Sequence, residues 1–417
     1  MSDDDESRVQ YKNKEVRMSR ADEIRNLHQD YVMPTYAPGL ALVRGKGSKV
    51  WDADGNGYLD FLSGISVVNV GHCHPRVVRA IRAQAGTLMH VSNLYFNEHQ
   101  PRLAKELAAR SLGGKCFFCN SGAEANEALI KLARLWGHES GRYEIITFRN
   151  SFHGRTLATL TATGQAKVQD GFEPLPAGFV YADYNDLDSV RAAVTDKTVA
   201  VLVEAVQGEG GVRPATGAFM SGLRALCDEK DLLLFCDEVQ CGMGRTGTWF
   251  GYQLYDMEPD AISLAKGLGG GFPIGAIVSN RKLADVFQPG RHATTFGGTP
   301  LACAAACAVI EVIEEEGLLE NASDMGDLFR ELLEKTARKH DFIREVRGAG
   351  LMIGMVLDRP AKPLETLLQE KGLLGLATSE NVLRFLPPLN VKAAEVRKAA
   401  RLVGKACAEW DKTLHAS

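Results

Sequence analysis

Two apolar segments of this chain end in side chains that could do chemistry together. Leu232–Cys236 is followed by Asp237, and Ala261–Ala265 is followed by Lys266. A lysine at the end of a buried strand loses solvation, so more of its amine is neutral and can attack an aldehyde. Asp237 could pair with a cationic ring nitrogen, because ligands bind beyond the carboxyl ends of parallel strands. A lysine that reaches solvent and a capping aspartate are the simpler alternatives.

An anion-binding pattern, Asn120–Glu124, opens the amphipathic segment Glu124–Trp136, whose spacing predicts a helix. Ser121 and Gly122 stand at its start, where free backbone N–H groups and the helix dipole attract a phosphate. An ordinary N-cap at Ser121 is an equally good interpretation.

The segment Asn150–Arg155 combines an aromatic ring with a guanidinium. Phe152 could stack on a planar ligand, and Arg155 could hold a carboxylate through two hydrogen bonds. His153 could act as a base or only pack against its neighbours, and the sequence favours neither.

Other patterns resemble binding motifs but lack the context that those motifs need. Gly242–Gly247 fits G-x-G-x-x-G, yet it does not open a helix directly after a strand, as a dinucleotide fold requires. Asp237-Glu238 could belong to a nucleotide-binding strand, but the chain has no G-x-x-x-x-G-K-[ST] loop. Cys116 and Cys119 have no second ligand pair, and the side chains of His72–His74 diverge along an extended stretch. We therefore predict no metal site.

The composition argues against several classes of partner. The chain has 417 residues, of which 48 are basic and 52 acidic, so its net charge of −4 does not suggest nucleic acid or an anionic membrane. No stretch is apolar enough to span a bilayer, and the acidic segment Met1–Glu6 is unlike a signal peptide. The odd number of cysteines, nine, argues against a disulfide framework. Together these features predict a cytoplasmic protein.

The elements that must position these residues alternate between helix and strand from about residue 76. Apolar runs of strand length separated by helices are typical of a mainly parallel sheet covered on both faces, and so of the α/β class. The predicted strands are Glu144–Phe148, Val199–Glu204, Leu232–Asp237, Ala261–Ala265 and Ile274–Ser279. The predicted helices are Arg76–Ala85, Gln100–Ser111, Glu124–Trp136 and Ala218–Lys230.

The two ends of the chain have a different pattern of predicted helices and strands. Val50–Tyr58 predicts a hairpin, with aspartate and glycine in its turn. After about residue 290 long helices and short strands predict a smaller α+β domain. Its helices are Leu301–Glu316, Asn321–His340 and Ala393–Leu414, and its strands lie near Ile343–Val346, Leu351–Leu357 and Val382–Phe385.

In combination, these segments resemble the class III pyridoxal-phosphate-dependent aminotransferases, over nearly the whole chain from about Tyr31. The resemblance is specific because many motifs appear in the family's order. They include Val50-Trp-Asp, Gly71-His-Cys-His-Pro, Phe117-Phe-Cys-Asn-Ser-Gly-Ala-Glu, Phe152-His-Gly-Arg-Thr, Gln207-Gly-Glu-Gly-Gly, Asp237-Glu-Val-Gln, Ala265-Lys-Gly-Leu-Gly, Thr295-Phe-Gly-Gly and Arg384-Phe-Leu-Pro-Pro-Leu.

The resemblance implies a set of residues that hold pyridoxal 5'-phosphate. Lys266 would bind the cofactor covalently and move the substrate's proton, and Asp237 would pair with the ring nitrogen. Phe152 would stack on the ring, and Gln240 would contact its phenolic oxygen. The phosphate would be bound by Ser121, Gly122 and Ala123, and by Thr295 of a partner subunit in a homodimer.

The resemblance also implies a set of residues that bind substrate. Arg384 would take the α-carboxylate of glutamate or 2-oxoglutarate, and Arg155 would take the distal carboxylate or the donor's carboxylate. Tyr36 would lie near Arg155. Glu209 would pair with Arg384 while a terminal-amine donor is bound and release it for glutamate.

The implied fold is the type-I pyridoxal-phosphate transferase fold, with a seven-stranded, mainly parallel sheet. Residues 66–295 would form the large cofactor-binding domain, while 1–65 and 296–417 would form an arm and a small α+β domain. The implied activity moves the terminal amino group of N-acetylornithine to 2-oxoglutarate in arginine biosynthesis. Ornithine, succinylornithine and 4-aminobutyrate are alternative donors, and a nucleotide-binding ATPase or a non-catalytic scaffold is a remote alternative.

Overall fold

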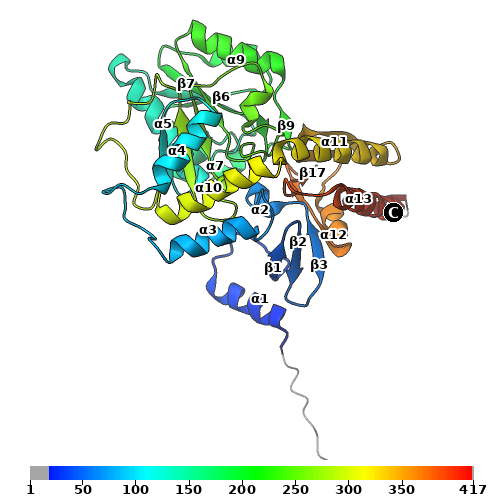
Figure 1. Ribbon diagram of the computed structural model, residues 1–417. Coiled ribbons are helices and arrows are strands. Elements are labelled where there is room, and N and C mark those ends of the chain that lie inside the picture. Colours follow the sequence, from blue (N-terminus) through cyan, green and yellow to red (C-terminus); the bar gives the residue numbers. More distant parts are fainter. Residues whose placement is uncertain (1–17, 416–417) are drawn as a thin grey trace, which may run out of the picture.

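Seven strands form one mainly parallel sheet in the computed structural model, which describes residues 18–415 (Figure 1). Their order is β4 (Cys116–Cys119), β12 (Gly275–Ser279), β11 (Ala261–Leu264), β10 (Leu233–Asp237), β7 (Thr198–Glu204), β5 (Glu144–Phe148) and β6 (Phe179–Ala182). The two pairs that include β12 are antiparallel and the others are parallel. The predicted α/β class is confirmed. The edge strand β6 was not predicted, because its residues are partly exposed and form no continuous buried run.

Different helices cover the two faces of this sheet. Along β10, Leu233 and Phe235 pack in one apolar cluster with α5 (Gly122–Trp136), whereas Leu234 and Cys236 pack in another with α9 (Gly217–Glu229). Successive residues of a strand point to opposite faces, so a sheet covered on both sides needs apolar residues at every position. This requirement explains the continuous apolar runs of the sequence.

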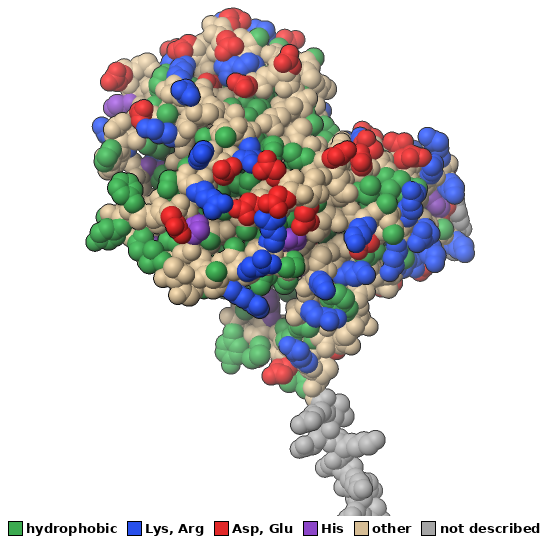
Figure 2. Space-filling view, in the orientation of Figure 1, with side chains coloured by type: hydrophobic (Ala, Val, Ile, Leu, Met, Phe, Trp, Pro, Cys, Tyr) green, Lys and Arg blue, Asp and Glu red, His purple; other side chains and the backbone are tan. Residues whose placement is uncertain are grey.

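The helix α10 (Pro300–Glu315) packs against α3 (Pro75–Ala85) and α4 (His99–Arg110). Figure 2 shows acidic and basic side chains gathered over this region. The ion pairs that join the three helices are Arg76–Glu311, Arg76–Glu315, Arg102–Glu311 and Arg110–Glu314. Residues 300–315 thus pack with helices from residues 75–110 and also contact α11 (Leu318–Ala337), and the domain boundary at residue 296 stays a prediction.

The small part of the molecule contains two four-stranded sheets. One has the order β1 (Leu42–Lys46), β2 (Lys49–Asp52), β3 (Gly57–Asp60) and β15 (Leu373–Leu374). The other has the order β13 (Ile343–Ala349), β14 (Met352–Leu357), β17 (Val382–Phe385) and β16 (Leu376–Thr378). Around them lie α11 (Leu318–Ala337), α12 (Lys362–Glu370) and α13 (Ala393–His415). Because β15 pairs with β3, segments from both ends of the chain share one sheet (Figure 1).

The shorter sequence patterns have structural roles. The predicted hairpin is formed by β2 and β3, and Cys116 and Cys119 are free thiols on β4. His72 contacts Asp60, while His74 contacts Glu316. Within residues 18–415 no three His, Cys, Asp or Glu side chains are grouped as a metal site requires. None of the helices formed by these residues combines the length and apolar character needed to cross a membrane. The segment Met1–Glu6 lies outside the described residues.

Three neighbouring strands of the large sheet end at, or two residues before, polar residues that lie at the same edge of the sheet. β7 ends at Glu204 and β10 at Asp237, and these two residues are direct partners in the parallel register. β11, which pairs with β10, ends at Leu264, two residues before Lys266. The carboxyl ends of parallel strands are where such sheets bind ligands. The fold therefore predicts a site at this edge.

We expect the centre of β10 to tolerate little loss of volume. Leu234 is fully buried, so Leu234→Ala should lower the free energy of unfolding by about 3 kcal/mol, through lost burial and the remaining cavity. Leu42→Ala, on a side chain that is 46% exposed, should cost less than about 1 kcal/mol. Urea unfolding of both variants measures the difference. Equal midpoints would contradict this account of the core.

Candidate active site

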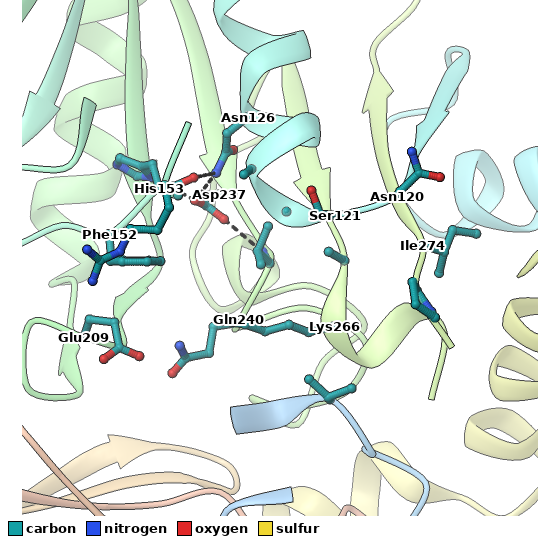
Figure 3. A pocket seen from close by; sticks show the side chains of 18 of the residues that line it. Asn120, Ser121, Asn126, Phe152, His153, Glu209, Asp237, Gln240, Lys266 and Ile274 are labelled. Carbon is teal, nitrogen blue, oxygen red and sulfur yellow. Dashed lines mark hydrogen bonds and ion pairs between the residues drawn. The ribbon is translucent and has the colours of Figure 1, made fainter. Parts of the chain in front are cut away.

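A cavity of about 410 Å³ lies at the carboxyl ends of these strands. It brings together nine of the residues predicted from the sequence: Ser121, Gly122, Ala123, Phe152, Arg155, Glu209, Asp237, Gln240 and Lys266. In Figure 3, Asp237, His153 and Asn126 converge at one wall, while Glu209 and Gln240 lie near one another at another wall. Residues from five separate stretches of the chain thus form one site.

The carboxylate of Asp237 is buried and surrounded by donors. Asn126 Nδ2 donates to Asp237 Oδ2 over 2.7 Å, and His153 Nδ1 lies 2.7 Å from the same oxygen. The backbone N–H of Val239 donates to Oδ1 over 3.0 Å, and the hydroxyl of Ser263 lies 3.4 Å from it. Both oxygens of the buried carboxylate thus have hydrogen-bond partners, which hold it in place beside the cavity.

Two further titratable groups stand behind Asp237. Burial alone would lower the pKa of His153, but the hydrogen bond to Asp237 and its charge raise it above its usual value. Burial raises the pKa of Glu204 to about 7, and the charge of Asp237 adds to the shift while His153 opposes it. Glu204 also accepts hydrogen bonds from the N–H groups of Phe152 and Gly208, at 3.0 and 3.1 Å. Glu204 therefore links the segment that carries Phe152 to the backbone at Gly208.

Lys266 begins a short 3-10 helix immediately after β11 and adopts a positive φ of 42°. Burial lowers the pKa of its amine, and the charge of Glu209 opposes this shift only in part. No described residue makes a hydrogen bond or ion pair with this amine. A half-buried lysine whose amine has a lowered pKa and no partner among the described residues is suited to attack a carbonyl carbon.

The start of α5 forms the end of the cavity near Ser121 (Figure 3). Ser121 Oγ accepts from Glu124 N over 3.2 Å, and Glu124 accepts from Asn120 N over 2.8 Å. The N–H groups of Gly122 and Ala123 have no partner among the described residues. A Cβ at Gly122 would lie 2.7 Å from Val239 Cγ1. The backbone here is thus open to an anion on one side and packed closely on the other.

The wall of the cavity near Glu209 and Gln240 contains an ion pair. Arg384, on β17, is fully buried and donates through Nη1 to Glu209 Oε1 over 2.6 Å and to Gln240 Oε1 over 3.2 Å. Its Nε and Nη2 have no hydrogen-bond partner within residues 18–415. Burial would raise the pKa of Glu209, but the charge of Arg384 lowers it below its usual value. Glu209 lines the cavity and Arg384 does not, so the carboxylate covers the guanidinium.

Two other predicted residues, Tyr36 and Thr295, stand apart from this arrangement, and Arg155 is an exposed member of the lining. Arg155 lines the cavity with its guanidinium 5.5 Å from the centre of the Phe152 ring. Tyr36 is 83% exposed and does not line the cavity. Thr295 is exposed and also lies outside the lining. The single chain therefore does not bring Tyr36 or Thr295 to the site.

Sequence reasoning missed Asn126 and Glu204. Asn126 lies one turn inside α5, where a polar residue at a buried position was a signal that could have been followed. Glu204 was assigned to a predicted strand but given no role, although it ends a fully buried run as Asp237 does. The sequence did not decide whether His153 acts as a base or only packs against its neighbours. In the structure its Nδ1 contacts Asp237, so it is a partner of that buried carboxylate.

The residues present fit pyridoxal 5'-phosphate. The cavity offers free N–H groups for a phosphate, a buried carboxylate for a protonated ring nitrogen, an aromatic face and a lysine amine for an aldehyde. Each of these features comes from a different element. Their convergence is the observation that identifies the site.

Comparison with known proteins agrees with this geometry. The family described as "Aminotransferase class-III" matches residues 32–406. An acetylornithine aminotransferase of Caldanaerobacter subterraneus subsp. tengcongensis is 51% identical, covering 91% of this chain and 98% of its own. One of Methanocaldococcus jannaschii is 52% identical, covering 86% and 90%. A crystal structure of an ornithine aminotransferase from Toxoplasma gondii superposes with a TM-score of 0.92 at 32% identity, covering 95% and 97%.

We expect His153→Ala to weaken cofactor binding. The variant removes a donor from the buried carboxylate of Asp237, and loss of a hydrogen bond to a charged group should raise the dissociation constant of pyridoxal phosphate roughly 10- to 100-fold. Titration of the cofactor-free protein with pyridoxal phosphate measures it. His340→Ala is the matched control, because His340 forms a similar pair with Asp411 in the small part of the molecule. Unchanged binding in His153→Ala would refute the role of this pair.

Proposed function

Because this chain belongs to the class III aminotransferases, we propose that it transfers the terminal amino group of N-acetylornithine to 2-oxoglutarate. The products would be N-acetylglutamate semialdehyde and glutamate, a step of arginine biosynthesis. The chain is a pyridoxal-phosphate-dependent aminotransferase, and the bound cofactor supplies an electron sink for the carbon that carries the amine.

The contact between Glu209 and Arg384 is the observation that carries the choice of substrates. An aminotransferase for a terminal amine must accept a neutral carbon chain in one half-reaction and the α-carboxylate of glutamate in the other. With Glu209 2.6 Å from Arg384, the guanidinium is neutralised beside the neutral chain. When Glu209 moves away, the same guanidinium can bind a carboxylate through two hydrogen bonds. One cavity can therefore serve both substrates.

The remaining residues of the cavity divide the chemistry between them. Lys266, whose pKa is lowered by burial, would take a proton from the carbon that carries the amine and return it. Asp237 would hold the proton on the ring nitrogen, supported by Asn126 and His153. Arg155, at the rim, would bind the donor's own carboxylate.

Ornithine is the main competing donor, because the solved structure with a TM-score of 0.92 is an ornithine aminotransferase. The identity is 32% there and 51% to an acetylornithine aminotransferase, so we rank N-acetylornithine first. Succinylornithine and 4-aminobutyrate are the other donors to test. They differ from N-acetylornithine at the end of the chain far from the reacting amine, where Arg155 would act.

We further propose a homodimer located in the cytoplasm. Apolar side chains of the segment 88–96 are exposed, among them Phe96, and Phe296 beside Thr295 is 61% exposed. His90 contacts the Phe296 ring, so both segments share one surface. Burial of this surface against a second copy would remove apolar area from water and place Thr295 at the partner's cavity. All nine cysteines are free, which is typical of a reducing compartment.

The proposed reaction predicts a two-step change in the visible spectrum. N-acetylornithine alone should bleach the absorption band of the bound cofactor, and 2-oxoglutarate should restore it, because each half-reaction changes the cofactor in turn. Lys266→Ala should bind pyridoxal phosphate but turn over at least about 1,000-fold more slowly. Bleaching by ornithine or 4-aminobutyrate in place of N-acetylornithine would keep the enzyme class and refute the donor. Absence of any band after addition of pyridoxal phosphate would refute the cofactor assignment.

Removal of the charge at position 209 should separate the two half-reactions. In Glu209→Gln the Arg384 cation has no compensating charge beside the neutral donor chain, so kcat/KM for N-acetylornithine should fall roughly 10-fold or more. Glutamate, which brings its own carboxylate, should react as well as before or better. Single-turnover spectra with each substrate measure both steps. Glu345→Gln, which breaks another Glu–Arg pair, is the control, and equal effects on both substrates would refute the gate.

A further inference from the structure

The G-x-G-x-x-G segment Gly242–Gly247 lies between the two parts of the molecule. It follows β10 as an irregular turn and leads into no helix of the kind that dinucleotide binding requires. Gly244 has a φ of 90°, and a Cβ there would lie 2.6 Å from Leu389 Cδ1. The glycine is therefore needed for close packing against the small part of the molecule. The residue that this turn presents is Arg245.

Arg245 is fully buried, and none of the ion pairs formed by the described residues includes it. Burial lowers the pKa of its guanidinium to about 9, so the group remains protonated at neutral pH and keeps its five donors. A buried cation without a carboxylate within ion-pair distance is costly, and such groups persist where oriented oxygens replace water. The more distant charge of Asp60 also favours the protonated guanidinium.

Two of the oxygens that bind Arg245 belong to the segment between β3 and α3, which includes the short helix α2 (Ser63–Ser66). Nε donates to Ser66 Oγ over 2.9 Å, and Nη2 donates to Asn69 Oδ1 over 2.7 Å. Ser66 Oγ also lies 3.2 Å from the carbonyl oxygen of Gln240, and Asn69 Nδ2 donates to Met243 O over 3.0 Å. These contacts tie Arg245 to the backbone of Gln240, whose side chain lines the cavity.

The other two oxygens belong to the sheet that carries Arg384. Nη1 donates to Leu351 O over 3.1 Å and to Pro387 O. Leu351 immediately precedes β14, and Pro387 lies two residues after β17 ends. β14 and β17 are antiparallel, with Ile353 opposite Phe385, so the two carbonyls lie at the same end of this strand pair. Arg245 therefore holds the end of the strand on which Arg384 stands.

From these contacts we propose that Arg245 is a positioning residue that fixes Arg384 relative to Gln240 and the cofactor cavity. The planar guanidinium of Arg245 contacts both the segment that touches Gln240 and the strand pair that carries Arg384. Arg384 Nη1 itself lies 3.2 Å from Gln240 Oε1. Binding of a dicarboxylate depends on this spacing, because a two-point clamp tolerates little displacement. The N-acetylornithine half-reaction binds no carboxylate at Arg384, so it should tolerate a small displacement that leaves Arg384 paired with Glu209. This inference rests on the proposed function.

Two variants and one matched control test the role of Arg245. Arg245→Lys keeps the charge but loses the planar fork, and Ser66→Ala removes one acceptor without touching the cavity lining. Ser63→Ala is the control, since Ser63 lies in the same segment, is fully buried and has a hydroxyl without a partner. Should Arg245→Lys fail to fold, Ser66→Ala decides the question.

The measurements are calorimetric binding of glutarate, an unreactive dicarboxylate, to the pyridoxal-phosphate-loaded protein, and affinity for pyridoxal phosphate itself. Both variants should bind glutarate roughly 10-fold more weakly, while cofactor affinity and the single-turnover rate with N-acetylornithine stay near those of the wild type. Ser63→Ala should match the wild type throughout.

Two outcomes would overturn the inference. Unchanged glutarate binding in both variants would show that Arg245 does not position Arg384, and a parallel loss of cofactor affinity would show a merely structural role. If the wild-type protein itself did not bind glutarate, the proposed function would fail first and this inference with it. The wild-type measurement therefore distinguishes the two failures.

Discussion

The buried carboxylate of Asp237 is the constraint on which the site depends. An ionised carboxylate withdrawn from water is stable only where donors replace the lost solvation. Asp237 receives them from α5, from the segment after β5 and from its own turn, through Asn126, His153 and Val239. Each donor fixes the element that carries it. The same contacts that stabilise the charge therefore place the start of α5 and Phe152 around one cavity.

The parts of this arrangement that follow from local pattern were predictable. The run Leu232–Cys236 is apolar at every position and is followed by Asp237, so a buried strand with a carboxylate at its end could be predicted, and Ser121 marks the start of α5. The direction of β12 was not predictable, because an apolar run is the same in a parallel or an antiparallel strand. Asn126 could be suspected as a polar residue on the buried face of α5, but its partner Asp237 is 111 residues away in the sequence. No local periodicity reports such a contact.

The G-x-G-x-x-G segment shows how one local pattern serves different structures. Glycines permit left-handed backbone and close approach, and both properties suit a phosphate as well as a packed turn. Here Gly244 meets Leu389 and the turn presents Arg245 to four oxygens of the protein. The context after the strand, and not the spacing of the glycines, distinguishes the two cases.

Arg384 affects the stability of the fold and, under the proposed gate, the choice of substrate. Two of its nitrogens are buried without partners, and each such donor costs about 1–3 kcal/mol. While Glu209 contacts Arg384, its carboxylate compensates the charge of the guanidinium. The Nε and Nη2 donors still have no acceptor among the described residues. A carboxylate that displaces Glu209 can satisfy more of these donors, because guanidinium and carboxylate pair through two parallel hydrogen bonds. Under the proposed gate, the exchange should be favourable for a dicarboxylate and unfavourable for a neutral chain. Discrimination between the two substrates would then follow from the hydrogen bonds that Arg384 lacks while Glu209 contacts it.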